Sequence, residues 1–193
     1  MISSMQEFFD IQSSSWDDKE RATASSLRLL LKDIPIQKRD KVLDLACGTG
    51  ILTPYLYEKT ECDVLGLDLS PKMIEKAKEK YQDNPHLHFE SGDFLHFEGE
   101  GFDWIVVFNA YPHFLDVEGF VQQAHRVLKP KGHLLVLHNL SRFELMAAHV
   151  GKAHPYSRDL DSAVEEGRKW GQNFKILDAK EDEHLFLLLG EKA

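Results

Sequence analysis

The glycine-rich turn at residues 47–50 constrains the fold of this chain most strongly. An apolar run from Lys41 to Ala46 leads into the turn, and a helical stretch then continues through Glu58. Pro54 fits only the opening turn of that helix, where a proline removes no helical hydrogen bond. A short buried strand, a glycine turn and a helix in this order are typical of parallel sheets. The sequence therefore predicts an α/β fold that begins near residue 40.

The same alternation of strand and helix recurs along the chain. Four further apolar runs, each typical of a buried strand, lie at 63–68, 86–90, 102–108 and 133–137. Ser70-Pro71 predicts a helix start after the second strand. Pro130-Lys131-Gly132 predicts the end of the helix that carries Val117 and Leu128. We expect a doubly wound, Rossmann-like sheet with five parallel strands and helices on both faces.

The segments outside this core differ in pattern. Residues 1–35 precede the first strand and include a helix from about Asp17 to Leu31, so we expect an N-terminal helical cover. The core of alternating strands and helices spans 40–138, and a helical cap without strands follows at 139–172. The end of the chain, 173–190, predicts an antiparallel hairpin, which brings the expected sheet to seven strands. We expect residues 1–193 to form one domain.

The composition excludes several classes of partner. The chain has 193 residues, with 23 Lys and Arg against 32 Asp and Glu, and a formal net charge of −9. This charge repels nucleic acid, because no basic cluster offsets it. No signal-peptide pattern and no bilayer-length apolar run is present, and the two cysteines, Cys47 and Cys62, suit a reducing cytosol. We expect a cytoplasmic protein with no nucleic-acid partner and no membrane partner.

Residues suited to ligand binding follow the strands. Ligands of doubly wound sheets bind beyond the carboxyl ends of the strands. Gly48 and Gly50 allow close backbone approach there, and the following helix offers free N–H groups. Asp68 ends the second strand, where a carboxylate can accept two hydrogen bonds from a ribose. Asp93 follows the third strand and can accept from an amino group. Each aspartate alone is also typical of a helix or turn cap.

Several motifs in order resemble one enzyme family. The stretch 42–50, VLDLACGTG, is similar to the glycine motif of class I S-adenosylmethionine-dependent methyltransferases. The stretches 65–73, 92–94, 102–106 and 126–134 are similar to the family's following motifs, so the resemblance covers about 40–140. Phe8-Phe9-Asp10 with Trp16-Asp17 resembles the small-molecule members of the ubiquinone and menaquinone biosynthesis type.

The resemblance implies an enzyme that transfers a methyl group to a small-molecule substrate, with S-adenosylmethionine as cofactor and S-adenosylhomocysteine as product. By the same resemblance, the backbone near the glycines holds the methionine end of the cofactor, and Asp44 supports that loop through water. Asp68 grips the ribose, and Asn109 lies beside the methionyl amino group. The adenine packs near two apolar side chains, and the third-strand turn reads its polar edge. The complete set of implied cofactor-binding residues is Asp44, Ala46, Gly48, Gly50, Asp68, Leu69, Met73, Asp93, Phe94 and Asn109. Ala46 stands where the fuller motif has glycine.

The acceptor residues are predicted from position in the fold. The fourth and fifth strands end on the methyl-donor side, so segments without strands are expected to cover that edge. His113 is the candidate for accepting a proton from the acceptor or orienting it; a histidine that only braces its loop is the structural alternative. The residues 109–114 lack the Asn/Asp-Pro-Pro-Tyr/Phe order of enzymes that methylate adenine or glutamine amides. The predicted substrate residues are Phe9, Trp16, Tyr111, His113 and His138.

Two other functions and a metal site are the alternatives to this interpretation. A nicotinamide-binding protein would need glycines in place of Ala46 and Ile51. A module that binds the cofactor without catalysis fits the same residues. His86 and His88 share one face of a strand, but the sequence supplies no adjacent acid or third histidine, so we expect no metal site.

Overall fold

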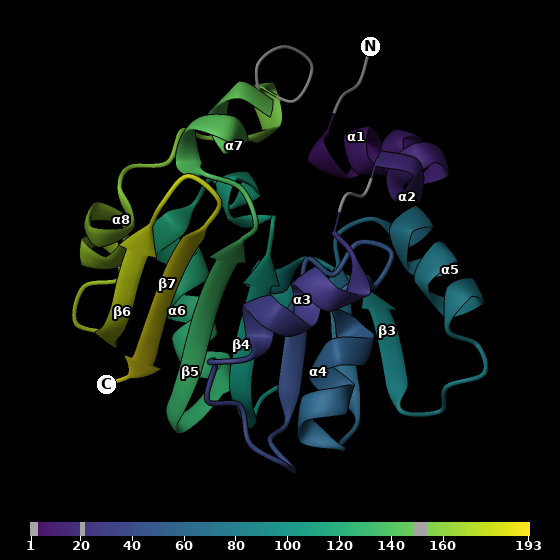
Figure 1. Ribbon diagram of the computed structural model, residues 1–193, viewed down its shortest axis with the longest axis horizontal. Coiled ribbons are helices and arrows are strands. Elements are labelled where there is room, and N and C mark those ends of the chain that lie inside the picture. Colours follow the sequence, from purple (N-terminus) through teal and green to yellow (C-terminus); the bar gives the residue numbers. More distant parts are fainter. Residues whose placement is uncertain (1–3, 20–21, 149–153) are drawn as a thin grey trace. The chain divides into compact units, whose positions relative to one another are not determined.

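The computed structural model describes residues 4–19, 22–148 and 154–193 (Figure 1). The chain forms two compact units that divide after Phe97. The first unit contains three strands: β1 (Val42–Leu45), β2 (Val64–Asp68) and β3 (Leu87–Ser91). Its helices are α1 (Met5–Gln12), η1 (Ser13–Ser15), α2 (Trp16–Lys19), α3 (Ala24–Leu31), α4 (Thr53–Thr60), α5 (Pro71–Lys80) and η2 (Phe94–His96).

The strands of the first unit are parallel and in the order β3-β2-β1. β1 is buried along its whole length, as expected of a strand covered on both faces. Helix α5 begins where Ser70 accepts a hydrogen bond from the Met73 N–H at 3.1 Å, with Pro71 in the first turn. The predicted helix starts at Pro54 and Pro71 are thus confirmed.

The N-terminal segment differs from the single helix expected over about 17–31. α2 and α3 are separate helices, and α1 precedes them. Thr23 starts α3 through a capping box with Ser26, which gives the chain a new helix start inside the expected one. Ser4 caps α1 by accepting from the Glu7 N–H at 3.1 Å. The one-helix prediction was wrong because the extended backbone and capping box of Thr23 begin a new helix inside the expected range.

The second unit carries the strands β4 (Phe102–Phe108), β5 (Leu128–His138), β6 (Phe174–Glu181) and β7 (Phe186–Lys192). β4 and β5 are parallel, while β7 pairs antiparallel with both β5 and β6, giving the order β4-β5-β7-β6. The helices are η3 (Tyr111–His113), α6 (Val117–Val127), α7 (Arg142–Ala148), η4 (His154–Tyr156) and α8 (Ala163–Lys169). Helix α8 packs beside β6 and β7, where a Cβ on Gly167 would lie 3.1 Å from Leu188 (Figure 1).

The boundary between α6 and β5 lies earlier than predicted. Helix α6 ends at Val127, and Leu128 is already extended, with ψ 145°, and pairs with Phe102. The expected helix end at Pro130-Lys131-Gly132 is therefore wrong. Residues 128–132 belong to the irregular start of β5, since the register shifts between Phe102 and Trp104.

The fold class itself is confirmed. The described residues form seven strands, most of them parallel, and the last two form the expected antiparallel hairpin. Within the described part of 139–172, the chain is helical and has no strand, as predicted for the cap. Residues 149–153 of that cap lie outside the described residues. No helix in the described ranges combines the length and the apolar character that crossing a membrane requires.

Candidate cofactor site

The turn after β1 has an unusual backbone. Ala46, Gly48 and Gly50 have positive φ angles of 57°, 56° and 80°. The Cys47 N–H donates to the Leu67 carbonyl of β2 at 3.2 Å, and the Gly50 N–H closes the turn on the Cys47 carbonyl at 2.9 Å. The predicted close turn is therefore built, and it is anchored directly to the neighbouring strand.

The two glycines of this turn have different surroundings. A Cβ on Gly50 would lie 2.9 Å from Phe89 and 3.0 Å from Tyr81, so Gly50 is required for packing inside the first unit. At Gly48 the nearest atom to such a Cβ is the Trp16 Nε1, 3.5 Å away, which is an ordinary contact. Gly48 therefore leaves room for a ligand to approach the backbone, whereas the missing side chain of Gly50 faces packed aromatic rings.

Asp68 at the end of β2 is held by the turns on both sides of it. Its Oδ2 accepts from the Gly48 N–H at 2.8 Å, and its Oδ1 accepts from the Ser70 N–H at 2.8 Å. Each carboxylate oxygen can accept one further hydrogen bond. Burial raises the pKa of Asp68 to about 6, against the lowering effect of the bonds from Ser70 and Gly48. The carboxylate is thus fixed in position and mostly ionised at neutral pH.

Asp44 is buried on β1, the strand that pairs with β2. Its Oδ2 accepts from the Thr53 hydroxyl at 2.6 Å, which ties β1 to the start of α4. Burial raises the pKa of Asp44 to about 7, and the nearby Asp68 raises it further, against the Thr53 bond. Asp44 therefore supports the loop by a direct bond to the helix that follows it.

The other predicted adenine contacts lie after β2 and β3. Met73 and Phe94 are buried, and Leu69 is half-buried. Asp93 caps η2, because its Oδ1 accepts from the Leu95 N–H at 3.0 Å and its Oδ2 lies 3.1 Å from His96 Nδ1. Asp93 thus performs the capping role that is common for an aspartate after a strand.

The N-terminal helices are bonded to two loops of the first unit that carry predicted cofactor residues. These two loops, the glycine turn after β1 and the loop between β2 and α5, are called the ligand loops. Asp10 accepts from the Ser70 hydroxyl at 2.5 Å and from the Lys72 N–H at 3.3 Å. Asp17 accepts from the Thr49 hydroxyl at 2.5 Å and from Lys80 Nζ at 3.0 Å. These bonds hold α1 and α2 against the glycine turn and the start of α5.

Two of the predicted substrate residues belong to this N-terminal segment. Phe9 meets Trp16 edge-on at 5.9 Å between ring centres, and Trp16 in turn lies against Gly48. The sequence reasoning used Phe9 and Trp16 but missed the roles of Asp10 and Asp17. The signal was present, because both aspartates stand inside the motifs that the family resemblance quoted.

The second unit holds the remaining predicted residues. Asn109 has a positive φ of 54°, and its side chain pairs with Asn139 through two bonds, Nδ2 to Oδ1 at 2.8 Å and Oδ1 from the Asn139 N–H at 3.2 Å. His138 is fully buried and meets the Phe186 ring edge-on at 5.7 Å. The structure therefore brings Asn109 to the end of β5 and places His138 in the core of this unit.

Tyr111 and His113 lie on η3 and contact the cap. The buried Tyr111 hydroxyl accepts from Trp170 Nε1 at 3.1 Å, and burial raises the pKa of Tyr111. His113 Nδ1 lies 2.7 Å from the Tyr156 carbonyl. Since a carbonyl only accepts, Nδ1 carries the hydrogen of this bond, and Nε2 is the basic nitrogen of the neutral ring.

The exposed His86 and His88 lie beside an aspartate that the sequence analysis did not identify. Asp63 lies 2.8 Å from His86 Nδ1 and 3.2 Å from His88 Nε2. Across the described residues, however, no group of three or more His, Cys, Asp or Glu side chains is arranged to hold a metal ion. The three residues therefore form an exposed polar cluster at the starts of β2 and β3.

Comparisons with known proteins agree with this geometry. Residues 42–132 match the family model described as a methyltransferase domain. The sterol 24-C-methyltransferase of Debaryomyces hansenii is 34% identical over 117 residues, 58% of this chain and 31% of that protein. The demethylmenaquinone methyltransferase of Thermotoga maritima is 36% identical over 99 residues, 51% of this chain and 43% of that protein. The chain spans less than half the length of these curated relatives.

A solved structure extends the likeness to nearly the whole chain. The crystal structure of a SAM-dependent methyltransferase from Aquifex aeolicus superposes with a TM-score of 0.76 at 17% identity, covering 95% of this chain and 98% of that one. The fold is therefore that of the class I S-adenosylmethionine-dependent methyltransferases. Within this fold, residues 42–132 match a methyltransferase domain, and the cofactor of the class is S-adenosylmethionine. The resemblance predicted from the motifs is confirmed.

Proposed function

We propose that the chain transfers the methyl group of S-adenosylmethionine to a small-molecule acceptor. The observation that carries the proposal is Asp68: a buried carboxylate at the end of β2, held by the N–H groups of Gly48 and Ser70 at 2.8 Å each. Such a carboxylate is suited to accept the two hydroxyls of a ribose. It stands beside a turn in which Gly48 leaves space for close approach.

The cofactor residues are proposed from this arrangement. Asp68 accepts the ribose hydroxyls, and the backbone of Ala46 and Gly48 faces the methionine end. Asp44 supports the turn through Thr53. When bound, the cofactor supplies a methyl group on a positively charged sulfur, which is already activated for displacement. The chain then has to align the acceptor and exclude water. The bonds of Asp10 and Asp17 to the ligand loops support a covering role for α1 and α2.

The remaining proposed cofactor contacts are Gly50, Leu69, Met73, Asp93, Phe94 and Asn109. We propose the loop Tyr111–Phe114 as part of the acceptor site, with His113 as the residue that accepts a proton through Nε2 or orients a hydroxyl. Phe9, Trp16 and His138 stay predicted acceptor contacts. We also propose that residues 1–193 form one domain.

The net charge and the matched relatives support the acceptor class that we propose. A net charge of −9 disfavours nucleic acid, and two of the relatives are named for a sterol and a demethylmenaquinone. We propose a small organic acceptor in the cytoplasm, with no membrane or nucleic-acid partner.

The proposal is tested by measuring S-adenosylhomocysteine production from S-adenosylmethionine. The acceptor panel holds small hydroxyl, amine and thiol compounds, a short-chain demethylmenaquinone and a sterol. Production above the acceptor-free background with at least one compound supports methyl transfer. Tight binding of the cofactor with no turnover of any acceptor supports the alternative of a non-catalytic binding module.

A further inference from the structure

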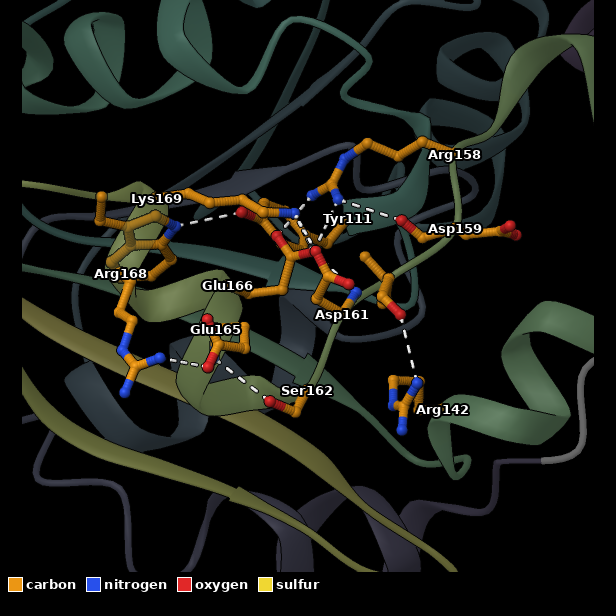
Figure 2. A network of polar contacts seen from close by, with 12 residues as sticks. Tyr111, Arg142, Arg158, Asp159, Asp161, Ser162, Glu165, Glu166, Arg168 and Lys169 are labelled. Carbon is orange, nitrogen blue, oxygen red and sulfur yellow. Dashed lines mark hydrogen bonds and ion pairs between the residues drawn. The ribbon is translucent and has the colours of Figure 1, made fainter.

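A network of charged side chains in the second unit joins the cap to the loop Tyr111–Phe114 (Figure 2). Its centre is the ion pair between Arg158 and Glu166, two parallel bonds of 2.8 and 2.9 Å from Nη1 and Nη2 to the two carboxylate oxygens. Glu166 is 0% exposed. A buried carboxylate is costly unless every oxygen is satisfied, so this pair calls for a role.

Glu166 is satisfied by four donors. Besides the two from Arg158, its Oε1 accepts from the Asp161 N–H at 3.0 Å and from Lys169 Nζ at 2.8 Å. Burial works to raise the pKa of Glu166, but the bonds from Arg158 and Lys169 lower it below the ordinary value. The carboxylate is therefore ionised and fixes the Arg158 guanidinium on both of its terminal nitrogens.

Each residue of the loop is bonded to the cap, and Arg158 makes most of the contacts. The Arg158 N–H donates to the Pro112 carbonyl at 2.9 Å, its Nε donates to the Phe114 carbonyl at 3.1 Å, and its guanidinium lies 4.7 Å from the centre of the Tyr111 ring. The fourth residue, His113, bonds to the Tyr156 carbonyl two residues before Arg158.

We propose that Arg158 and Glu166 are positioning residues: Glu166 orients Arg158, and Arg158 fixes the loop so that His113 keeps its hydrogen on Nδ1 and its basic nitrogen at Nε2. This inference rests on the proposed function, in which that loop meets the acceptor. A lysine cannot replace Arg158, because the flat guanidinium bonds to Glu166 and to the Phe114 carbonyl at the same time.

The variant Glu166→Gln tests the inference, because glutamine keeps the shape but not the charge or the second acceptor oxygen. The matched control is Glu165→Gln, the same change on the neighbouring residue of α8. Glu165 is half exposed and pairs with Arg168 (Figure 2). Arg158→Lys is the second test variant. All variants are compared below their melting temperatures, with folding checked by circular dichroism.

The first measurement is the nitrogen NMR spectrum of the His113 ring, which distinguishes hydrogen on Nδ1 from hydrogen on Nε2 and needs no acceptor. We expect one tautomer, Nδ1–H, in the wild type and in Glu165→Gln, and a mixture in Glu166→Gln and Arg158→Lys. An unchanged His113 spectrum in both folded test variants would overturn the inference.

The second measurement separates the inference from the proposed function. We expect Glu166→Gln to raise the KM for a short-chain demethylmenaquinone at least tenfold, while the Kd of S-adenosylhomocysteine changes less than twofold. Failure of the wild type to bind S-adenosylhomocysteine would refute the proposed function, whatever the His113 spectrum shows. Wild-type turnover together with an unchanged KM in both test variants would refute the inference alone.

Discussion

Two residues of the glycine turn share one backbone conformation but differ in the conformational free energy that it requires of them. Ala46 and Gly48 have φ angles of 57° and 56°. The left-handed region costs a residue with a Cβ about 1–2 kcal/mol, while glycine loses about 0.5–1 kcal/mol of chain entropy on folding. We predict that Ala46→Gly raises the free energy of unfolding by about 0.5–1 kcal/mol and that Gly48→Ala lowers it by a similar amount. Urea unfolding measures both, and equal signs for the two changes would contradict the assignment of strain to this turn.

Asp44 makes the folded protein less stable as the pH rises. Its pKa is about 7 in the folded state against 3.8 ordinarily. Below pH 4 it is protonated in both states; as the pH rises from 4 to 7, the unfolded chain releases this proton first, so stability is lost over that window. We predict that Asp44→Asn, which can still accept from Thr53, raises the free energy of unfolding relative to the wild type by up to about 4 kcal/mol at pH 8.

The pH series supplies the control for Asp44→Asn. The gain should shrink steadily below pH 7 and vanish near pH 4, as measured by denaturant unfolding at each pH. A gain that is independent of pH would show that it arises from packing and not from the ionisation of Asp44.

The ligand residues at strand ends could be predicted, but their partners could not. Asp68 and Gly48 stand in local motifs, so the sequence identified both. The bonds of Asp10 to Ser70 and of Asp17 to Thr49 span 60 and 32 residues. Such pairings depend on where the N-terminal helices pack, which a local pattern does not contain. The same reason hid Asp63, which is 23 residues from His86.

At the level of elements, Asp17 is one of the two carboxylates, with Asp10, that hold the N-terminal helices. Burial works to raise the pKa of Asp17, but the bonds from Thr49 and Lys80 lower it. Because Asp17 is half exposed, these bonds together are worth about 1 kcal/mol. We predict that Asp17→Ala speeds amide hydrogen exchange in residues 5–18 about fivefold and leaves β1 and β2 unchanged.

Asp18→Ala serves as the matched control for this prediction. Asp18 lies on the same helix and is exposed. Its removal should leave the exchange rates of the N-terminal helices as they are in the wild type. Equal acceleration by both changes would indicate a general loss of helix α2 and not release from the glycine turn.

The elements that the sequence predicted well are those fixed by their own residues. β4 is apolar along 102–108 except at Asp103 and has the predicted bounds, and Ser70-Pro71 set the start of α5. The wrong predictions concern boundaries of helices and strands that are set by contacts of a few residues. The Thr23 capping box divides the expected helix. The pairing of Leu128 with Phe102 makes β5 begin at Leu128, before the predicted start at 133. Neither contact has a signature in hydrophobic periodicity.

For the whole molecule, the motifs predicted the fold and the cofactor class, whereas the acceptor depends on features outside them. One fold serves many reactions, so the acceptor has to be argued from particular side chains. Here those are the residues of the loop Tyr111–Phe114 and of the cap segment that is bonded to it. The ion pair of Arg158 and Glu166 joins residues eight apart within a segment that the sequence described only as helical and polar.

The most direct test of the central claim is calorimetric titration of S-adenosylmethionine, S-adenosylhomocysteine and NADH into the wild type, Asp68→Ala and the control Asp63→Ala. We predict that both sulfur compounds bind the wild type at one site and that NADH does not. Asp68→Ala should weaken their binding by about 1.5–3 kcal/mol, roughly tenfold or more, because it removes hydrogen bonds to a charged group. Asp63→Ala should bind as the wild type does. Binding of NADH without either sulfur compound, or wild-type affinity in Asp68→Ala, would contradict the account.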